Sequence, residues 1–466
     1  MNRKTDFDVL ILGAGASGLA AACAAASSGV SAAAVDGNAK VGRKLSATGN
    51  GRCNFTNIRC TASDYNREAE SFVEKVFRFC SPEDTIRAFQ ESGLLVREEQ
   101  EGRCYPYSGQ ASAVTGMLFQ RAVSSGARFL LEDAAVSCSS DRGVFSVSLS
   151  SGRILTSRSL IIASGGRAGL HFGSTGDGYG FARSFGHSLN PPRPALVACE
   201  SDDPRLSGLR GRARAQVTLM EDGRDICSEY GEVQFTGTGL SGICVMNLSR
   251  YMDASRPPVK KKKKRSQDEQ KKHRSSEDVP RHQYRIRIDF LPEYPVEKIA
   301  SLLAGSLERV DLEEALSWLL NDRIAAAAAA IVRNASGGQI DSRSAGLSGE
   351  AGRAAELLKG FQVKIDHTKG WNDAQVTRGG IRLSEIDPAS MASLFQPGLY
   401  FCGEVVDVDG PCGGYNLQWA WSSGYLSGVS AAEFAAGKPG RPEEQNYTDK
   451  GRHDRAQNQS DPSPSR

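Results

Sequence analysis

Three glycines near the start of the chain have the spacing that brings backbone close to a phosphate group. Gly13, Gly15 and Gly18 form G-x-G-x-x-G between the apolar run "FDVLIL" and the alanine-rich stretch "LAAACAAASSG". We therefore expect the motif at a turn from a buried strand into a helix. The first glycine allows the tight turn, the second lets backbone approach a pyrophosphate, and the third lets helix and strand pack closely.

A carboxylate follows this motif at a distance that suits a ribose. The run "VSAAAVD" predicts a second strand that ends on Asp36, 23 residues after Gly13. Strand, helix and strand together span about 30 residues, which is the size of a parallel crossover. At the end of that strand, a carboxylate can accept hydrogen bonds from ribose hydroxyls. These elements predict dinucleotide binding, with a glycine-rich packing turn as the alternative.

Loops elsewhere in the chain favour a flavin dinucleotide over a nicotinamide dinucleotide. A flavin is held along its whole length by scattered segments, whereas an NAD dehydrogenase needs only the crossover and a catalytic domain. Three further segments follow predicted strands: "VGRKLSATGNGRCNFTN", "SGGRAG" and "GEVVDVDGPCGGYNLQWAWSSGYLSG". No second G-x-G-x-x-G follows a strand, which argues against a separate NAD(P)H domain. We expect FAD as the cofactor, with NAD(P)H as a transient reductant or oxygen in its place.

The chain resembles the family of flavoproteins that includes aminoacetone oxidase and the bile-acid-inducible reductase BaiN, within the glutathione-reductase-like FAD superfamily. The stretches that carry the resemblance cover most of residues 6–435: "GAGASGLAAA", "GRKLSATGNGRCNFTN", "GSTGDGYGFARSFGH", "FTGTGLSG", "IDFLPEYP", "VTRGGIRLSEI" and the long segment from Gly398 to Gly428. The resemblance implies FAD and a redox reaction, and it leaves the substrate open. It also implies that Glu404 hydrogen-bonds the ribityl or pyrophosphate region. A lysine-rich loop departs from the family pattern.

The last predicted helix is expected to point its first turn at the flavin. Asp409 and the turn through Gly413 and Gly414 would aim the N–H groups near Asn416 and Leu417 at the pyrimidine edge of the ring. That edge gains negative charge when hydride reaches N5, and the positive end of a helix dipole stabilises such charge. A structural glycine turn at the start of a helix is the alternative.

The remaining predicted contacts come from the loops after the other strands. Arg43 and Lys44 are expected to neutralise the pyrophosphate, and the segment 50–54 to face the ring, with a solvated basic loop as the alternative. The complete set of predicted cofactor contacts is Gly13, Gly15, Ala16, Ser17, Gly18, Asp36, Arg43, Lys44, Asn50, Gly51, Arg52, Cys53, Asn54, Val136, Gly165, Gly166, Asp177, Gly403, Glu404, Asp409, Gly413, Gly414, Asn416 and Leu417.

The cysteines show no metal or redox pattern, and the candidates for a catalytic group are few. The eleven cysteines form no C-x-x-C pair and no Cys/His cluster, so we expect neither a disulfide framework nor a metal site. Cys53 lacks a nearby second cysteine, which favours a packed thiol over a redox-active one. His171 and Asn54 are the candidates for proton transfer, and His187 is expected to cap a helix.

These segments predict an α/β fold in which a Rossmann-like FAD-binding domain is built from both chain ends. A β-rich domain, with short alternating stretches and Asp-Gly turns, and a small helical segment are inserted into it. We expect this insert to cover the flavin ring and to select the substrate. The expected ranges are 1–195 and 371–436 for the FAD-binding domain, 196–292 for the β-rich domain, 293–370 for the helical segment, and 256–282 and 437–466 for a disordered basic loop and a disordered tail.

The charge of the chain is uneven. Between Arg256 and Arg285 there are 12 Lys and Arg against 4 Asp and Glu, or +8, while the remaining 45 basic and 50 acidic residues give −5. The basic segment has no aromatic residue among its lysines to stack on bases, and the rest is acidic. We therefore expect a small-molecule substrate and no nucleic-acid partner.

The leading hypothesis is thus an FAD-dependent oxidoreductase that transfers hydride between flavin N5 and a small organic molecule. A flavoenzyme that acts on nucleic acid and a non-enzymatic flavin-dependent redox sensor are the alternatives. No stretch approaches 18 apolar residues and no cleavable leader is recognisable, so we expect a cytoplasmic protein without a membrane partner. The oligomeric state stays open.

Overall fold

We describe the fold from a computed structural model, which defines residues 4–252, 282–334 and 349–438. The basic loop expected at 256–282 lies outside the described residues except for its last residue. The tail expected at 437–466 lies outside them from residue 439 on. No helix in the described part of the chain is long and apolar enough to cross a membrane.

The chain divides into two units. The first unit comprises the residues up to Arg193 and those from Val376 on, and the inserted unit comprises Pro194–Gln375. The chain leaves and re-enters the first unit through a two-stranded sheet formed by β10 (Leu189–Ala195) and β18 (Val376–Ile381).

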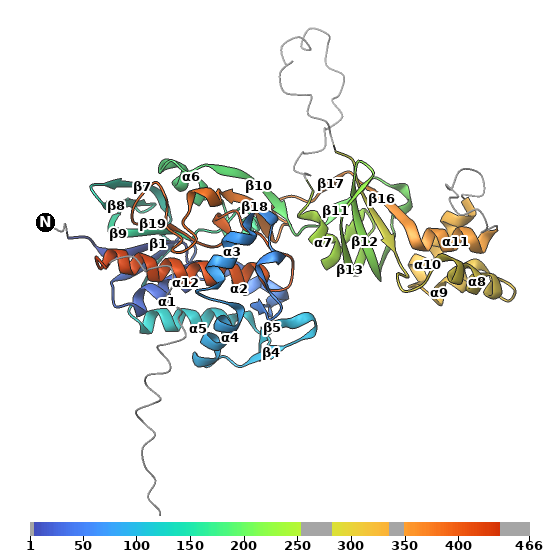
Figure 1. The fold of residues 1–466 in the computed structure, drawn as a ribbon, viewed down its shortest axis with the longest axis horizontal. Helices are drawn as coiled ribbons and strands as arrows, with labels where there is room; N and C mark the ends of the chain where they lie inside the picture. Colours follow the sequence, from blue (N-terminus) through green and yellow to red (C-terminus); the bar gives the residue numbers. More distant parts are fainter. Residues whose placement is uncertain (1–3, 253–281, 335–348, 439–466) are drawn as a thin grey trace, which may run out of the picture. The chain divides into compact units, whose positions relative to one another are not determined.

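The first unit is built on a seven-stranded sheet with the order β6-β2-β1-β9-β8-β7, in which β19 also pairs with β9. The pairs β1–β2, β1–β9, β2–β6 and β9–β19 are parallel, and β7, β8 and β9 pair antiparallel. Both ends of the chain therefore contribute to one sheet, and the expected α/β fold class is confirmed (Figure 1). The strands are β1 (Phe7–Leu12), β2 (Ala32–Asp36), β6 (Arg128–Leu131), β7 (Ala135–Asp141), β8 (Val144–Leu149), β9 (Ile154–Ile162) and β19 (Leu399–Phe401).

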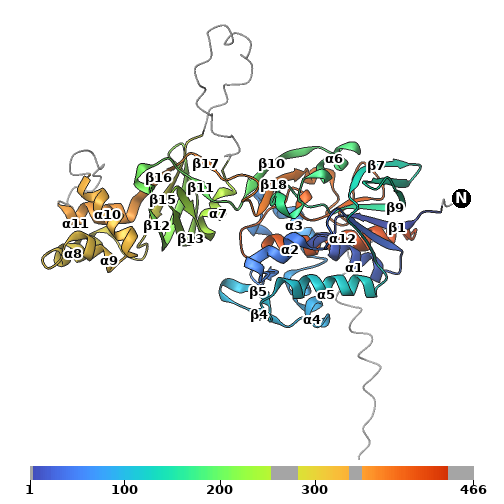
Figure 2. The ribbon, with the colours of Figure 1, turned by 180° about the vertical axis from the view of Figure 1, so that it is seen from behind.

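Strand β1 is apolar throughout its centre because its two faces belong to two different hydrophobic cores. Val9 and Ile11 pack with helices α1, α5 and α12, whereas Leu10 and Leu12 pack on the opposite face of the sheet. A parallel strand that is covered on both faces has no position left for a polar side chain. The three helices are α1 (Ala16–Ser27), α5 (Ala111–Ser124) and α12 (Tyr415–Ala435) (Figure 2).

Helices α1 and α12 pack at very short range through glycines. A Cβ added to Gly424 would lie 2.4 Å from the carbonyl oxygen of Ser17, and one added to Gly428 would lie 2.5 Å from that of Ala21. No side chain fits at either glycine, because atoms at these distances overlap. The first helix and the last helix are therefore held directly backbone to backbone.

The remaining elements of the first unit surround this framework. A three-stranded sheet has the order β3-β5-β4, and several short helices follow the strands of the main sheet. These elements are α2 (Arg43–Ala47), β3 (Thr56–Asn57), α3 (Glu70–Phe77), α4 (Pro82–Glu91), β4 (Val96–Glu98), β5 (Arg103–Pro106) and α6 (Asp177–Ser184).

The inserted unit holds a second seven-stranded sheet, with the order β16-β15-β12-β13-β14-β11-β17 and antiparallel pairing between all neighbouring strands. The long hairpin of β12 and β13 turns at Asp222 and Gly223, which both have positive φ, as an Asp-Gly hairpin turn requires. The strands are β11 (Cys199–Glu200), β12 (Arg210–Glu221), β13 (Arg224–Thr236), β14 (Gly239–Ser241), β15 (Tyr284–Asp289), β16 (Phe361–Ile365) and β17 (His367–Thr368).

The expected helical segment at 293–370 is helical only as far as Gly360. The final stretch "FQVKI" alternates apolar and polar residues, so it returns to the sheet as β16 beside β15, and β17 follows it. The helices of the inserted unit are α7 (Ile243–Ser249), α8 (Val296–Leu307), α9 (Leu312–Ser317), α10 (Asp322–Asn334) and α11 (Glu350–Gly360).

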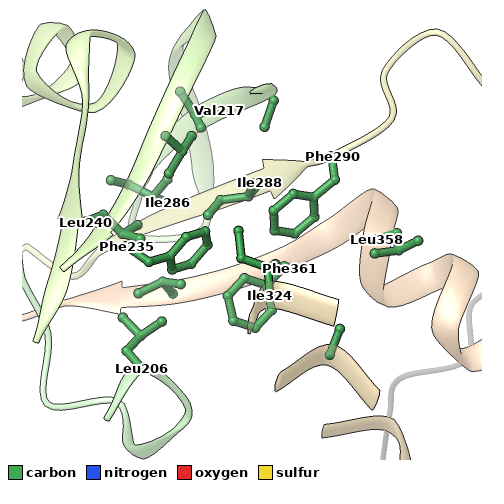
Figure 3. Close-up of a cluster of buried hydrophobic side chains, with 14 of the residues drawn as sticks. Leu206, Val217, Phe235, Leu240, Ile286, Ile288, Phe290, Ile324, Leu358 and Phe361 are labelled. Carbon is green, nitrogen blue, oxygen red and sulfur yellow. The ribbon is translucent and has the colours of Figure 1, made fainter. Parts of the chain in front are cut away.

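The core of the inserted unit lies between the sheet and these helices. Figure 3 shows Phe235, Phe290 and Phe361 from the strands and their ends beside Ile324 of α10 and Leu358 of α11. All five side chains are buried. The inserted unit therefore has a hydrophobic core of its own.

Candidate functional site

The carboxyl ends of the central parallel strands bring four distant loops together. A Cβ on Gly13, after β1, would lie 2.5 Å from the carbonyl oxygen of Ala163, after β9. A Cβ on Gly403, after β19, would lie 2.4 Å from Oγ of Ser17. The N–H of Gly42, in the loop after β2, donates to the carbonyl of Ala14 over 2.9 Å. In doubly wound sheets, ligands bind at this edge.

The three motif glycines differ in what surrounds them. A Cβ on Gly18 would lie 1.9 Å from the carbonyl oxygen of Gly13, so this position is closed by the protein itself. A Cβ on Gly15 would meet no atom within 4 Å. Gly15 is also the N-cap of α1, where no side chain caps the helix and no acidic residue lies in the first turn. The first turn of α1, with Ala16 and Ser17, thus offers N–H donors towards open space.

Asp36 organises the adjacent loop at the end of β2. Its Oδ2 accepts a hydrogen bond from the N–H of Ala14 over 2.8 Å. Its Oδ1 accepts from both the backbone N–H and the side-chain amide of Asn38, each over 2.8 Å. The carboxylate is therefore fixed beside the glycine turn, where we predict a contact with the ribose.

An ion pair joins the loop after β2 to the loop after β19. Nζ of Lys44 lies 2.8 Å from Oε2 of Glu404. The other oxygen of Glu404 accepts the N–H of Thr377 over 2.8 Å, and Oγ1 of Thr377 accepts the N–H groups of Arg167 and Ala168 just after Gly165 and Gly166. The predicted residues Lys44 and Glu404 thus bind each other within the protein, and Thr377 is a member of the cluster that sequence reasoning missed.

The segment 54–57 lies against the first turn of α12. A Cβ on Gly414, the N-cap of α12, would lie 2.5 Å from the carbonyl oxygen of Thr56 and 2.9 Å from Oδ1 of Asn54. The indole N–H of Trp421 donates to the carbonyl of Phe55 over 2.8 Å. The loop after β2 and the first turn of α12 therefore lie side by side.

Helix α12, like α1, begins after a glycine N-cap and has no capping side chain. Gly413 and Gly414 have φ of 125° and 100°, no side chain caps the helix, and no acidic residue lies in its first turn. The side chain of Asn416 is occupied, because it bonds to the backbone of Gly410 and Pro411. At this helix start the backbone N–H groups of the first turn, up to Leu417, are therefore better placed to serve a ligand than the side chain of Asn416.

The residues at this edge fit a bound FAD in three respects. Open space lies in front of Gly15 and also in front of Gly165, which has φ of +73°. Two uncapped helix starts supply N–H donors for a pyrophosphate and for an anionic ring edge. Oδ1 of Asn54 is buried without a hydrogen-bond partner among the described residues, beside the start of α12.

Several predicted residues have other partners. The guanidinium of Arg52 pairs with Glu99 and lies 4.3 Å from the centre of the Tyr105 ring. Arg43 donates to Oδ1 of Asn38 and to the carbonyl of His171. Both arginines therefore bind protein groups. Asn50 and Gly51 are exposed at the tip of the loop, and both have positive φ.

Three further candidates lie on the surface of the first unit. Asp177 begins α6 and accepts a hydrogen bond from Thr175, while the side chain of His171 is exposed and its ring lies against Phe172. Val136 lies on β7 with 62% of its surface exposed. The side chains of these residues take no part in the contacts that join the four loops.

Cys53 is a buried thiol, as expected. Its side chain is fully inaccessible, and burial raises its pKa to about 12, with an opposing hydrogen bond to Thr48. None of the eleven cysteines forms a disulfide, and no group of His, Cys, Asp and Glu in the described part of the chain could hold a metal ion.

His187 caps the end of α6 as expected, because its backbone N–H donates to the carbonyl of Ala182 over 3.1 Å. Its ring is buried in a polar network. Nδ1 lies 3.2 Å from Oε2 of Glu385, and Nε2 lies 2.7 Å from Oγ of Ser393. Burial lowers the pKa of His187, and Glu385 partly offsets this effect. Only the fold brings these groups together, since they are some 200 residues apart in sequence.

Asp407 is a buried acid that was not among the residues predicted from the sequence. Burial raises the pKa of its carboxyl group, and the hydrogen bond from Nδ2 of Asn190, over 2.6 Å, opposes that rise. The carbonyl of Asp407 accepts from Asn66, which also binds the backbone of Asp409. This network fixes the acidic loop between Glu404 and the start of α12.

Comparisons with known proteins agree with this architecture. The family model described as "HI0933-like protein Rossmann domain" matches residues 7–430. A 3-dehydro-bile acid delta(4,6)-reductase from Clostridium scindens is 32% identical over 442 residues, which cover 91% of this chain and 98% of the relative. Ribosomal RNA dihydrouridine synthases from Haemophilus influenzae and Escherichia coli are 29% and 28% identical, and each alignment covers 90% of this chain and 97% or 96% of the relative.

Proposed function

Because the chain belongs to the HI0933-like Rossmann family, which includes FAD-dependent oxidoreductases of the BaiN type, we propose that it reduces a carbon–carbon double bond conjugated to a carbonyl group. The observation that carries the proposal is the pair of uncapped helix starts, α1 after Gly15 and α12 after Gly414, with a buried Asn54 oxygen beside the second start that has no partner among the described residues. This arrangement suits a flavin that must carry negative charge when reduced.

The choice of reaction rests on what the relatives' names have in common. One name describes reduction of double bonds in a 3-dehydro-bile acid, and the other describes formation of dihydrouridine in ribosomal RNA. In a 3-oxo steroid with Δ4,6 unsaturation and in uracil, the double bond is conjugated to a carbonyl. The shared chemistry is therefore a better guide to this chain than either substrate.

The reaction adds a hydride to the carbon distal to the carbonyl and a proton to the carbon next to it. FAD supplies the hydride when it is bound and reduced, with NAD(P)H as the source of electrons. The N–H groups after Gly15 would bind the pyrophosphate, and Asp36 would bind the ribose. The start of α12 would stabilise the charge on the pyrimidine edge.

Two residues, Asn54 and His171, are the candidates for the group that donates the proton to the substrate. Asn54 carries no acidic proton, so its role would be to orient the ring or the substrate carbonyl through hydrogen bonds. His171 belongs to the loop after β9, and its side chain is exposed. We propose His171 as the candidate acid and Asn54 as a positioning residue.

A second candidate reaction is the reduction of uridine within RNA. It is favoured by a row of exposed arginines beside two aromatic side chains in the inserted unit. The two candidates share the flavin site and differ only in the substrate.

The experiment is an anaerobic titration followed by absorbance. The purified protein, supplied with FAD, should show flavin bands that bleach with NADH or NADPH and return on addition of 2-cyclohexen-1-one or a 3-oxo-4,6-diene steroid. Absence of bound flavin would overturn the assignment. Flavin that is restored by air and by none of the unsaturated carbonyl compounds would instead indicate an oxidase.

A further inference from the structure

Three arginines lie in a row on one face of β12. Arg210, Arg212 and Arg214 alternate with Gly211 and Ala213, and all three arginines are exposed. Alternate residues of a strand lie on the same face, about 7 Å apart. The row therefore presents three cationic groups at regular intervals along the hairpin, comparable with the separation of phosphates in an extended nucleic-acid strand.

The end of this row opens into a recess with exposed aromatic rings. Arg214, Tyr230 and Trp318 line it, together with Glu293, and its volume is about 460 Å³. Tyr230 is 49% exposed and Trp318 is 59% exposed. The hydroxyl of Tyr230 donates to Oε1 of Glu293 over 3.3 Å, which restrains the ring. Large aromatic side chains with half of their surface in water are available to stack on a planar group.

Most of the charge of the row is available to a ligand. Arg212 pairs with Glu232 over 3.2 Å, but both side chains are more than half exposed, so this pair is weak. Within the part of the chain that the structure describes, neither Arg210 nor Arg214 forms an ion pair, and the guanidinium of Arg214 lies 5.9 Å from the centre of the Tyr230 ring.

We propose that this surface binds single-stranded RNA, with phosphates along Arg210, Arg212 and Arg214 and with bases stacked on Tyr230 and Trp318. Nucleic acid in single strands is bound by cationic tracks combined with aromatic platforms. An acidic peptide would need the arginines but not the rings, and a free nucleotide would fill the recess but not the row. The inference deepens the second candidate of the proposed function, since uridine in RNA would need such a binding surface.

The test measures binding, so it is independent of flavin chemistry. A uridine-rich RNA of 16 nucleotides with a fluorescent end label is titrated with full-length protein, and anisotropy is followed at several salt concentrations. Trp318→Ala should weaken binding about tenfold, as expected when one base loses its stacking partner. The matched control is Tyr294→Ala, since Tyr294 is 46% exposed in the same unit and does not line the recess.

The arginines are tested through the salt dependence. The double variant Arg210→Gln/Arg214→Gln should lower the slope of log affinity against log salt by about 1.4, because about 0.7 is lost per phosphate contact with a single strand. Arg309→Gln, an exposed position between α8 and α9, is the control. Every comparison is repeated with Lys260–Lys264 changed to glutamine, so that binding by this lysine run cannot mask the effect.

The outcomes separate this inference from the proposed function. If the recess and row variants bind RNA as well as their controls do, the inference is wrong, even when the protein reduces unsaturated carbonyl compounds. If NADPH occupies the recess and RNA does not bind, the inference is also wrong. If the variants lose RNA while no double bond is reduced, the binding surface stands and the proposed reaction fails.

Discussion

Lys44 and Glu404 form an ion pair that links two loops 360 residues apart in the chain. Their side chains are 27% and 22% exposed, so the pair is largely shielded from water. Because Glu404 also accepts the N–H of Thr377, it connects the loops after β2 and β19 to the start of β18. One carboxylate thus links three segments at the edge of the sheet that we assign to the cofactor.

The first prediction concerns this pair. Glu404→Gln keeps an oxygen for Thr377 and removes the charge, so FAD affinity should fall about tenfold through loss of loop order. The double variant with Lys44→Met should cost about 1 kcal/mol less than the sum of the single changes, because the pair is lost only once. The measurement is a double-mutant cycle, in which the apoproteins of the wild type, the two single variants and the double variant are each titrated with FAD. Additive effects would mean that the two residues act independently.

The second prediction uses the different surroundings of the glycines. Gly15→Val should weaken FAD binding at least tenfold and leave the fold intact, because the new side chain meets no protein atom and enters the space expected for the pyrophosphate. Gly116→Val in α5, which also has no atom within 4 Å, is the control. FAD titration and thermal unfolding of the apoprotein are the measurements. Equal FAD affinity of the two variants would place the pyrophosphate elsewhere.

The third prediction addresses the contact of α1 with α12. Gly424→Val forces a side chain into the carbonyl of Ser17, so the free energy of unfolding should fall by about 1–3 kcal/mol or more. Gly305→Val in α8 has open space and should change stability little. Urea unfolding measures both. A similar loss in the two variants would show that close helix packing is not what Gly424 provides.

The fourth prediction follows from His187. Its pKa is lowered in the folded state, so the folded protein binds fewer protons than the unfolded chain below about pH 6.5. Stability should therefore be full above that pH and fall as the pH decreases. In His187→Gln, the protein should be less stable at pH 7.5, and the difference from wild type should shrink by pH 5.5. Parallel pH profiles of the two proteins would exclude His187 as the cause.

The fifth prediction concerns Cys53, whose pKa is raised to about 12 by burial. At pH 8 the folded protein should protect this thiol from a maleimide, since the thiol is both neutral and inaccessible. Above about pH 9 the unfolded chain releases the proton first, so stability should fall as the pH rises. The less buried Cys412 provides an internal comparison in peptide mapping. Rapid labelling of Cys53 in native protein would contradict the structure.

The sequence predicted the parts of the fold that depend on local pattern. The run "FDVLIL", the three motif glycines and Asp36 identify a crossover by spacing alone, and the Asp222–Gly223 turn identifies a hairpin. The segment 361–368 was wrongly assigned to helix, because a short strand after a long helical stretch carries too few residues to show its own period.

The contacts that fix the site could not be predicted in the same way. Thr377, Asp407 and the partner of His187 act through neighbours that only the folded chain supplies. The arginine row illustrates the same limit, because "RGRAR" shows its charge in the sequence but not the aromatic rings of Tyr230 and Trp318 beside it. The expectation that nucleic acid is not a partner was based on the lysine loop, and it stays a prediction that the RNA titration will test.

The backbone contact between α1 and α12 sets the order of events during biosynthesis. The ribosome makes α1 within the first 30 residues and α12 only after residue 414. At about 10 residues per second, roughly 40 s pass before α1 meets the helix that covers it. Throughout that time the face of α1 that meets α12 at Ser17 and Ala21 lacks its final partner, so a nascent chain that stops before Gly414 exposes this face and lacks one of the two helix starts that we assign to FAD.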